Sequence, residues 1–266
     1  MKRRRLNFPV KPLAVILIII LASCLILGYI WRILFTAEYF RIKDISSREV
    51  LSVDLSYLKG KNIFSLNLAQ EAAGIVRSCP DCSRVKLARI IPNRIFVELI
   101  RRKLVAFIKL YRYFAVDEDG VIFLSPLQPD DSGLPVITGL ETKIFGPKPG
   151  NRYESRELSV ALLILKESAK TRLLRDYKIR KVDISGIDNI TVGIPIPQSQ
   201  NVYAGWKAPQ KIEFLEIKIG QGNIRDKVAI MAGLINQERH NMANIKYIDL
   251  RFNEPVIKFK EDKVRK

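Results

Sequence analysis

The clearest chemical potential in this sequence lies in two cysteines spaced as CxxC, in the segment Cys79-Pro80-Asp81-Cys82. A catalytic dithiol of this form opens a helix directly after a strand, whereas the pattern here predicts the end of a helix followed by a strand. Redox catalysis is therefore disfavoured. In an oxidising compartment Cys79 and Cys82 can form a short disulfide that fixes the helix–strand turn, and free thiols are the alternative.

Two further patterns imitate catalytic or cofactor-binding sites, and the composition excludes two kinds of metal site. Ser56-Tyr57-Leu58-Lys59 has the S-x-x-K form of acyl-serine enzymes, but the S-D-N and K-T-G motifs that complete such a site are missing. Gly220-Gln221-Gly222 begins like a dinucleotide-binding loop, yet Arg225 takes the place of the third glycine. One histidine, His240, and three cysteines are too few for a multi-histidine or four-cysteine metal site. We therefore expect no catalytic residue, no metal and no cofactor, and a binding protein rather than an enzyme.

The first element along the chain is a long apolar segment. Leu13 to Trp31 contains no charged side chain and is about the length that crosses a bilayer core, and we place the span at residues 13–35. Residues 1–12 carry Lys and Arg but no acid, so the positive-inside rule predicts that this basic tail stays in the cytoplasm. We expect a single-pass type II protein of the cell membrane with most of its chain outside the cytoplasm.

Two alternatives to a permanent anchor fit these residues less well. A cleaved signal peptide has a shorter apolar core and a small-residue cleavage site, and neither matches this segment. Leu21-Ala22-Ser23-Cys24 has the form of a lipobox, but the apolar run continues past Cys24. Tyr29 and Trp31 fit better as anchors at the outer membrane interface.

The net charge is +18, from 45 Lys and Arg against 27 Asp and Glu. Such a balance is often found in nucleic-acid-binding proteins, but a domain outside the cytoplasm meets no nucleic acid. We expect the excess charge to face anionic lipid headgroups, wall polymers or acidic partners instead.

The exposed region predicts an α+β fold in two domains. Residues 38–103 form a small POTRA-like βααββ domain, in which Asn67 caps the second helix. Its expected strand, two helices and two strands lie at about 39–45, 51–58, 67–78, 85–91 and 95–99. The pair of strands that ends the domain is joined by a turn at Pro92-Asn93.

Residues 104–260 predict a larger, mainly antiparallel β domain with two helices, followed by a charged tail at 261–266. Its helices are expected at 154–177 and 223–239, and prolines and glycines between 125 and 152 indicate ordered loops or a crossover. Its strands are expected at about 104–109, 111–116, 121–124, 178–184, 190–194, 201–206, 212–219, 245–252 and 255–259. Asp117-Glu118-Asp119-Gly120 is the expected hairpin turn, because glycine accepts positive φ.

The order of these parts resembles the FtsQ/DivIB family of bacterial cell-division proteins over nearly the whole chain. The segments that carry the resemblance are Gly60-Lys61-Asn62-Ile63-Phe64, Pro92 to Glu98, Val116 to Phe123, Leu134 to Gly139, Ile219-Gly220 and Tyr247 to Phe252. Two departures stand out. Ile100 to Ala106 lacks the glutamate and proline of the family's E-R-x-P-x-A, and Ile194 to Ala208 is longer than the family's usual hairpin.

The resemblance implies a non-enzymatic divisome scaffold at the septum, in the inner membrane with its bulk in the periplasm or equivalent space. It also implies binding of FtsB-like and FtsL-like proteins, recruitment of other divisome membrane proteins, and a role in controlling septal peptidoglycan synthesis. The alternatives are a POTRA-containing transport or envelope-assembly component, which a following β-barrel would distinguish, and a wall hydrolase or acyltransferase using Ser56 and Lys59.

The residues themselves suggest how a partner would bind. A final strand at 255–259 leaves a sheet edge whose backbone groups can pair with a partner strand, and Pro255 suits an edge position. We expect Arg251, Phe252, Val256 and Phe259 to frame this site, with Arg251 pairing a partner carboxylate. The alternative is that Phe252 and Val256 are core residues.

Overall fold

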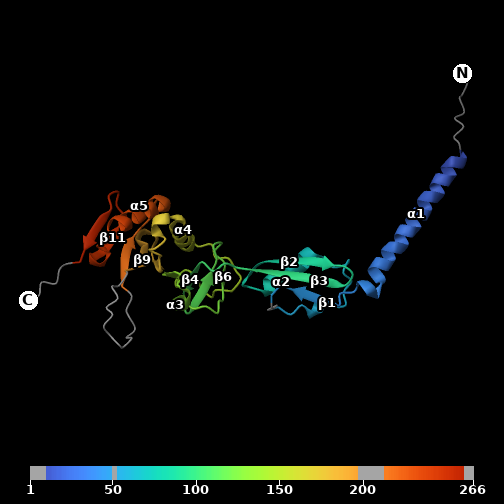
Figure 1. The fold of residues 1–266 in the computed structure, drawn as a ribbon, viewed down its shortest axis with the longest axis horizontal. Coiled ribbons are helices and arrows are strands. Elements are labelled where there is room, and N and C mark those ends of the chain that lie inside the picture. Colours follow the sequence, from blue (N-terminus) through green and yellow to red (C-terminus); the bar gives the residue numbers. More distant parts are fainter. Residues whose placement is uncertain (1–9, 50–52, 197–212, 261–266) are drawn as a thin grey trace, which may run out of the picture. The chain divides into compact units, whose positions relative to one another are not determined.

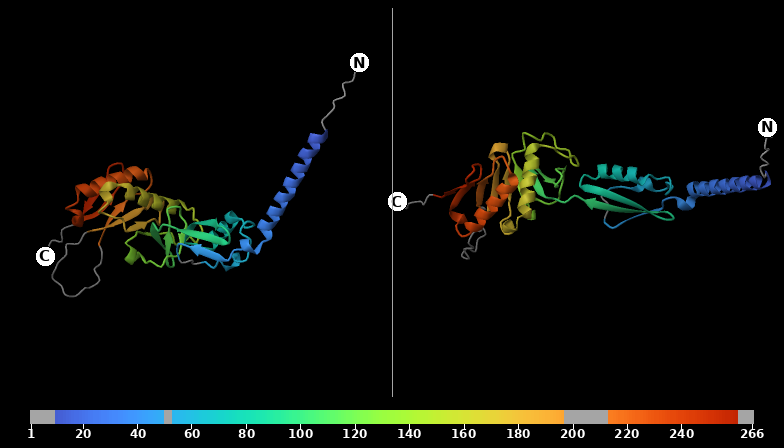
Figure 2. Two further views of the ribbon diagram at one scale, coloured as in Figure 1. Left: turned by 45° about the vertical axis from the view of Figure 1, so that its right-hand side comes forward. Right: turned by 90° about the horizontal axis from the view of Figure 1, so that it is seen from above.

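A computed structural model describes residues 10–49, 53–196 and 213–260 (Figures 1 and 2). Contacts divide the chain into two compact units, residues 1–101 and 102–266. The predicted α+β class is confirmed, with an N-terminal apolar helix and β-rich units after it.

The N-terminal helix α1 runs from Val10 to Thr36. Its segment Ala14–Thr36 is long and apolar enough to cross a membrane, with a mean hydropathy of 2.7 and no residue of that stretch buried inside the protein. Exposed Ile and Leu side chains on every face of a helix are unfavourable in water and favourable in lipid. The helix therefore has the properties of a membrane span.

The rest of the first unit is a three-stranded sheet with one helix. Its elements are η1 (Glu38–Phe40), β1 (Asp44–Ser47), η2 (Ser56–Leu58), α2 (Leu68–Ser78), β2 (Cys82–Ile90) and β3 (Arg94–Arg101). The strand order is β1-β3-β2, with β1 parallel and β2 antiparallel to β3. As predicted, the Asn67 side chain caps α2 by accepting the Gln70 N–H at 3.2 Å.

Two elements of this unit differ from the sequence prediction. The first strand begins at Asp44, because the chain makes the 3₁₀ turn η1 on leaving α1. Within the described residues, the first of the two expected helices is only the 3₁₀ turn η2. The Asp54 carboxylate accepts the Ser56 N–H at 2.9 Å and so starts this turn, and Gly60 at φ 82° ends the segment.

The second unit contains a nine-stranded mixed sheet in the order β12-β11-β10-β9-β8-β7-β4-β5-β6. Its strands are β4 (Ala106–Lys109), β5 (Tyr113–Val116), β6 (Ile122–Phe123), β7 (Val136–Thr138), β8 (Lys181–Asp183), β9 (Thr191–Pro195), β10 (Phe214–Lys218), β11 (Ile245–Asp249) and β12 (Val256–Phe259). Most neighbours are antiparallel, as predicted. The pairs β4–β7, β7–β8 and β10–β11 are parallel.

Two helices, α4 (Arg156–Lys170) and α5 (Ile224–Gln237), pack against each other and lie on the same side of this sheet (Figures 1 and 2). Each presents an apolar stripe to one continuous core, as the helical periodicity predicts. Buried members of that core include Leu158, Ile164, Val228, Met231, Ile108, Val182 and Ile217.

The segment between residues 125 and 152 contains structure that the sequence did not predict. It holds the short helix α3 (Pro129–Ser132) and the strand β7, which lies between β4 and β8. A three-residue strand has too little local pattern to be recognised, and its neighbours on both sides hold it in place. The expected long helix ends at Lys170, with the 3₁₀ turn η3 (Arg172–Leu174) after it. The strand expected at 201–206 lies outside the described residues.

Gly139, directly after β7, is expected to be intolerant of a side chain. It has φ +87°, and an added Cβ would lie 2.6 Å from the Cα of Ser185. We expect Gly139→Ala to lower the free energy of unfolding by at least about 2 kcal/mol. Thermal unfolding of the full chain in detergent, followed by circular dichroism, measures this. Gly186→Ala is the control, because Gly186 has φ −142° and open space at its Cβ. Equal losses in the two variants would contradict the argument.

Candidate functional site

The strand β12 lies at one end of the nine-stranded sheet. In the described part of the chain it pairs only with β11, antiparallel, with Ile248 opposite Ile257 and Asp249 opposite Val256. Just past the strand, the Lys260 N–H donates to the Asn244 carbonyl at 2.7 Å, so it points toward β11. Because backbone groups alternate in direction along a strand, the N–H groups of Phe259 and Ile257 point to the free edge.

The predicted site residues of this edge are mostly exposed. Phe252 is 63% exposed, Val256 48% and Phe259 49%, so none of the three is a core residue. Ile257 is partly buried and packs against the core, which holds the strand on the sheet. An exposed group of large apolar side chains beside an unpaired strand edge is typical of a protein-binding surface.

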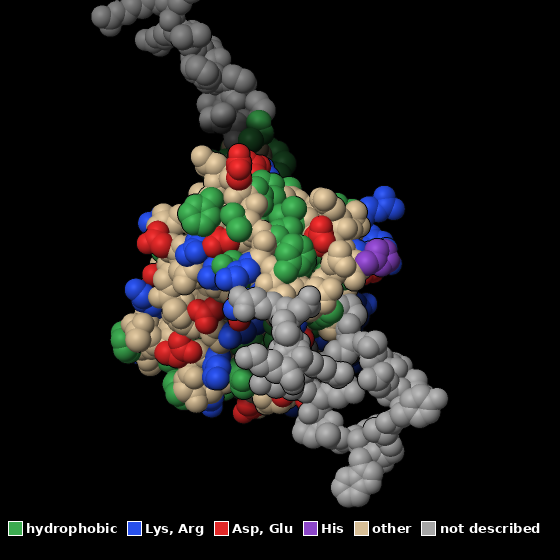
Figure 3. Space-filling view, turned by 90° about the vertical axis from the view of Figure 1, so that its left-hand side faces the viewer, with side chains coloured by type: hydrophobic (Ala, Val, Ile, Leu, Met, Phe, Trp, Pro, Cys, Tyr) green, Lys and Arg blue, Asp and Glu red, His purple; other side chains and the backbone are tan. Residues whose placement is uncertain are grey.

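A shallow hollow extends this surface onto α5. Its lining includes Ile230 of α5 together with Phe252 and Pro255 from the segment before β12. Figure 3 views the molecule from the end where these elements lie and shows hydrophobic side chains gathered among charged ones. Ile230, which is 43% exposed, was not among the predicted site residues. It could have been recognised in the sequence as a large apolar residue outside the apolar stripe that α5 buries.

Arg251, the fourth predicted site residue, has a partner within its own chain. Its Nη2 lies 2.6 Å from Oδ2 of Asp249, its Nε lies 2.9 Å from Oδ1, and its Nη1 donates to Asn189 at 3.3 Å. The Asp249 side chain is buried. The structure therefore supplies Arg251 with an internal carboxylate in place of the partner carboxylate that the sequence suggested, and we assign Arg251 to supporting the edge.

The same cluster sets the charge states around the end of β11. Hydrogen bonds from Arg251 hold the pKa of Asp249 below its ordinary value, and Asp249 in turn raises the pKa of Arg251. Burial lowers the pKa of Lys227, whose Nζ donates to the Ile219 carbonyl at 2.8 Å. The Lys227 bond fixes α5 to the turn after β10, and the Leu250 N–H, which donates to the Lys218 carbonyl at 2.7 Å, fixes the end of β11 to β10.

The glycine pair that imitates a dinucleotide loop is a turn. Gly220 and Gly222 have φ values of 64° and 112° and connect β10 to α5. A Cβ on Gly220 would lie 2.8 Å from Cγ of Arg251, so a glycine is needed for close packing. The carbonyls of Ile219 and Gln221 accept hydrogen bonds from Lys227, which occupies the inside of the turn.

The other residues that resemble parts of a catalytic site are Ser56 with Lys59, and His240. Each has a structural partner or lies exposed. The Ser56 hydroxyl donates to the Asp54 carboxylate at 3.0 Å, and hydrogen bonds from Ser56 lower the pKa of Asp54. Lys59 is the residue that ends the η2 turn. His240 is exposed beyond the end of α5. The geometry favours a turn at Ser56 over an activated nucleophile.

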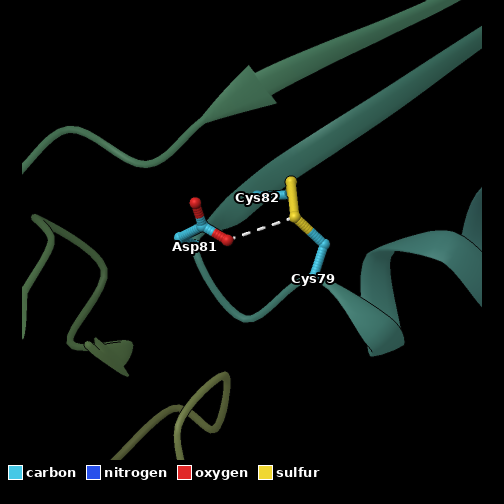
Figure 4. Close-up of side chains that lie close together, drawn as sticks. All are labelled: Cys79, Asp81 and Cys82. Carbon is cyan, nitrogen blue, oxygen red and sulfur yellow. Dashed lines mark hydrogen bonds between the residues drawn. A yellow bond between two sulfur atoms is a disulfide. The ribbon is translucent and has the colours of Figure 1, made fainter. Parts of the chain in front are cut away.

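Cys79 and Cys82 are joined by a disulfide that links the end of α2 to the start of β2 (Figure 4). Both residues are buried. The Asp81 carboxylate lies 3.2 Å from the Cys79 sulfur and accepts a hydrogen bond from Arg101 at 2.7 Å. With both sulfurs in the disulfide, the group Cys79, Asp81 and Cys82 has no thiolate to offer a metal ion.

Removing this disulfide is expected to cost a modest amount of stability. It closes a loop between residues only three apart in sequence, so Cys79→Ser with Cys82→Ser should lower the free energy of unfolding by about 2 kcal/mol. Urea unfolding of the full chain with and without a reductant measures the effect. A reductant that destabilises the double variant as much as the unchanged protein would contradict this assignment. Cys24→Ser, at the exposed free cysteine, is the matched control.

Comparison with known proteins gives a consistent result. The model of the family described as "Cell division protein FtsQ/DivIB, C-terminal" matches residues 106–251. A protein named Cell division protein FtsQ from Geotalea daltonii is 23% identical over 239 residues, covering 86% of this chain and 80% of the relative. The protein of the same name from Geobacter sp. strain M21 is 21% identical, covering 83% and 73%. The one from Anaeromyxobacter sp. strain K is 27% identical, covering 74% and 63%.

The family match covers the second unit from the start of β4 to Arg251, and so includes most of the sheet on which the exposed edge is built. The longest of these alignments also extends over most of the chain. The resemblance found in the sequence is therefore confirmed, and the chain belongs to the FtsQ/DivIB family of cell-division proteins.

Proposed function

We propose that this protein is a non-enzymatic divisome scaffold that binds FtsB-like and FtsL-like proteins outside the cytoplasm. The observation that carries the proposal is the free edge of β12, flanked by the exposed side chains of Phe252, Val256 and Phe259. Family membership supports cell division as the process in which this edge works.

The proposed topology is a single pass through the inner membrane with the N-terminus in the cytoplasm. The apolar stretch Ala14–Thr36 supports the pass, and the basic residues that precede it in the sequence support the orientation. Both folded units then lie in the periplasm or the equivalent outer space. At the division septum they meet the outer parts of other single-pass division proteins.

The proposed binding mode is addition of a partner strand to β12. The outward backbone groups of Ile257 and Phe259 supply the hydrogen bonds, which give affinity, and the neighbouring side chains give specificity. The hollow at Ile230, Phe252 and Pro255 has the chemistry to accept an apolar side chain of the partner. Lys258 is exposed on the strand, so an acidic partner segment is favoured.

The proposed consequence is control of wall synthesis through assembly. A scaffold fixed to the membrane by α1 keeps its bound partners at the septum, where they recruit and regulate the synthase of septal peptidoglycan. In this scheme the protein contributes position and affinity and no covalent chemistry.

Imaging and depletion in the native host test the proposal. An N-terminally labelled copy is expected to collect at midcell, and depletion of the endogenous protein is expected to give filaments without septa. The divisome role would be refuted if the label were spread evenly around the membrane and depleted cells divided normally.

The non-enzymatic part of the proposal has its own test. A Ser56→Ala copy removes the serine hydroxyl of the S-x-x-K segment, and it is expected to restore division in depleted cells as fully as the unchanged protein. An equally expressed Ser56→Ala protein that fails to restore septa would contradict the non-enzymatic proposal and support the acyl-serine hypothesis. Ser65→Ala, at another exposed serine of the same unit, is the control.

A further inference from the structure

One end of the three-stranded sheet lies close in the chain to the end of α1. The parallel register pairs Asp44 with Arg94, so β1 and β3 begin at the same end, and β2 finishes there because Ile90 also pairs with Arg94. The Lys43 N–H donates to the Asn93 carbonyl at 2.9 Å. The turn between β2 and β3 is thus beside the segment that has just left α1, which ends at Thr36.

Hydrogen bonds tie this turn to α1 through the loop at residues 62–66. The Asn62 amide donates to the carbonyls of Leu34 and Phe35 at 2.8 and 3.1 Å, which satisfies groups that the helix end leaves unpaired. On the other side of the loop, Arg89 donates to the carbonyls of Ile63 and Leu66 at 2.7 and 2.6 Å. Arg89 directly precedes Ile90 in the chain. The turn is therefore held at a defined position next to the end of α1.

The tip of this turn is apolar, which is unusual for an exposed turn. Ile90 is 43% exposed and Ile91 is 64% exposed. Tyr39, in the η1 turn directly after α1, is 63% exposed. These three side chains lie near the end of the span, where apolar and aromatic groups are favoured at the interface between lipid and water.

The cations around this tip complement an anionic surface. Arg41, Lys43 and Arg94 are exposed at the same end of the sheet. The ion pairs of Arg94 with Asp44, at 3.0 Å, and of Arg41 with Glu38, at 3.9 Å, are solvent-exposed and therefore weak. Each basic residue close to an anionic leaflet adds to membrane attraction, and the effect falls off with distance from the surface.

We propose that the β2–β3 turn of the first unit docks on the outer leaflet of the membrane that α1 crosses. Ile90 and Ile91 insert among the headgroups, with Tyr39 beside them and Arg41, Lys43 and Arg94 facing lipid phosphates. This inference rests on the proposed membrane anchoring. It gives the first unit a fixed orientation on the membrane, because the turn and the span hold it at two separate points.

Depth-dependent fluorescence quenching in proteoliposomes tests the docking. The full chain is reconstituted in phosphatidylethanolamine and phosphatidylglycerol, with a dye on Ile91→Cys in a Cys24→Ser background, and the lipids carry a nitroxide near the headgroup. Ile91 is well exposed, so the substitution leaves the fold intact, and Ile90→Cys is the second variant. Lys86→Cys is the matched control, because Lys86 is exposed on the same strand, about 13 Å along it from Ile90 and away from the turn.

We expect quenching at residue 91 to exceed that at residue 86 by roughly threefold or more, since only the turn reaches the headgroups. Replacing the anionic lipid by phosphatidylcholine should reduce quenching at 91 by about twofold or more. Equal quenching at 91, 90 and 86 would overturn the docking, and insensitivity to lipid charge would overturn the role of the three cations.

A label on Cys24 separates this inference from the anchoring on which it rests. Cys24 lies within the apolar stretch of α1, so a nitroxide deep in the acyl chains should quench its dye. Quenching at Cys24 without excess quenching at residue 91 would overturn the docking alone. Absence of quenching at Cys24 would overturn both the docking and the proposed anchor.

Discussion

Phe259→Pro is expected to weaken binding of an FtsB-like partner by about a hundredfold or more while the second unit stays folded. The Phe259 N–H points to the free edge, so proline leaves the pairing of β12 with β11 intact. At the free edge it removes a donor and places a ring where the added strand must lie. Titration of a labelled partner peptide into the full chain in detergent measures the change in Kd.

Phe259→Ala is the matched control for the lost ring. It removes the apolar side chain but keeps the N–H, so the expected loss of affinity is smaller, on the order of tenfold. A proline variant that binds as well as the alanine variant would show that the partner does not add a strand to β12. Circular dichroism of both variants checks that the sheet is retained.

Asp249→Ala is expected to lower the free energy of unfolding by about 2–3 kcal/mol. The variant removes the buried carboxylate of Asp249 and so leaves the charge of Arg251 without its partner. The estimate is at the low end for a buried ion pair, since Arg251 is about a third exposed and water screens its charge. Urea unfolding followed by circular dichroism measures it. In a double-mutant cycle, Arg251→Ala should add little to Asp249→Ala, and full additivity would contradict a direct pairing.

The same pair predicts a dependence of stability on pH. The pKa of Asp249 is lower in the folded protein than its ordinary value of 3.8, so the folded state favours the charged form. The stabilisation is fully present above the unfolded pKa and is lost as the pH falls below about 4 through the folded pKa. Asp249→Asn should therefore lose stability less steeply between about pH 5 and pH 2 than the unchanged protein. Parallel curves would contradict the assignment.

Support of the edge and contact with the partner should separate in the two sets of variants. Phe259→Pro changes binding and leaves the free energy of unfolding nearly constant, because its N–H makes no bond within the sheet. Asp249→Ala mainly lowers the free energy of unfolding. It affects partner binding only indirectly, by altering the position of β11 and Phe252. This contrast distinguishes a residue that meets the partner from one that positions the surface.

The sequence alone determined the elements whose signals are local. The apolar run gave α1, the Asn67 cap and helical spacing gave α2, and alternation on either side of Pro92 gave β2 and β3. The exposed edge at β12 was also predicted, because Pro255 and the last alternating residues are a local pattern. The ordered motifs along the chain were sufficient to identify the family.

The tertiary structure decided what depends on neighbours distant in sequence. β7 is a strand because β4 and β8 pair with it on both sides, although its three residues carry little pattern of their own. Arg251 donates a hydrogen bond to Asn189, which is distant in sequence, as well as to nearby Asp249. An arginine beside an edge strand predicts equally well a contact with a partner, and only the fold brings Asn189 within its reach. A charge that is partly removed from water is stabilised only when it is paired and hydrogen-bonded, and only the folded chain shows which partner is within reach.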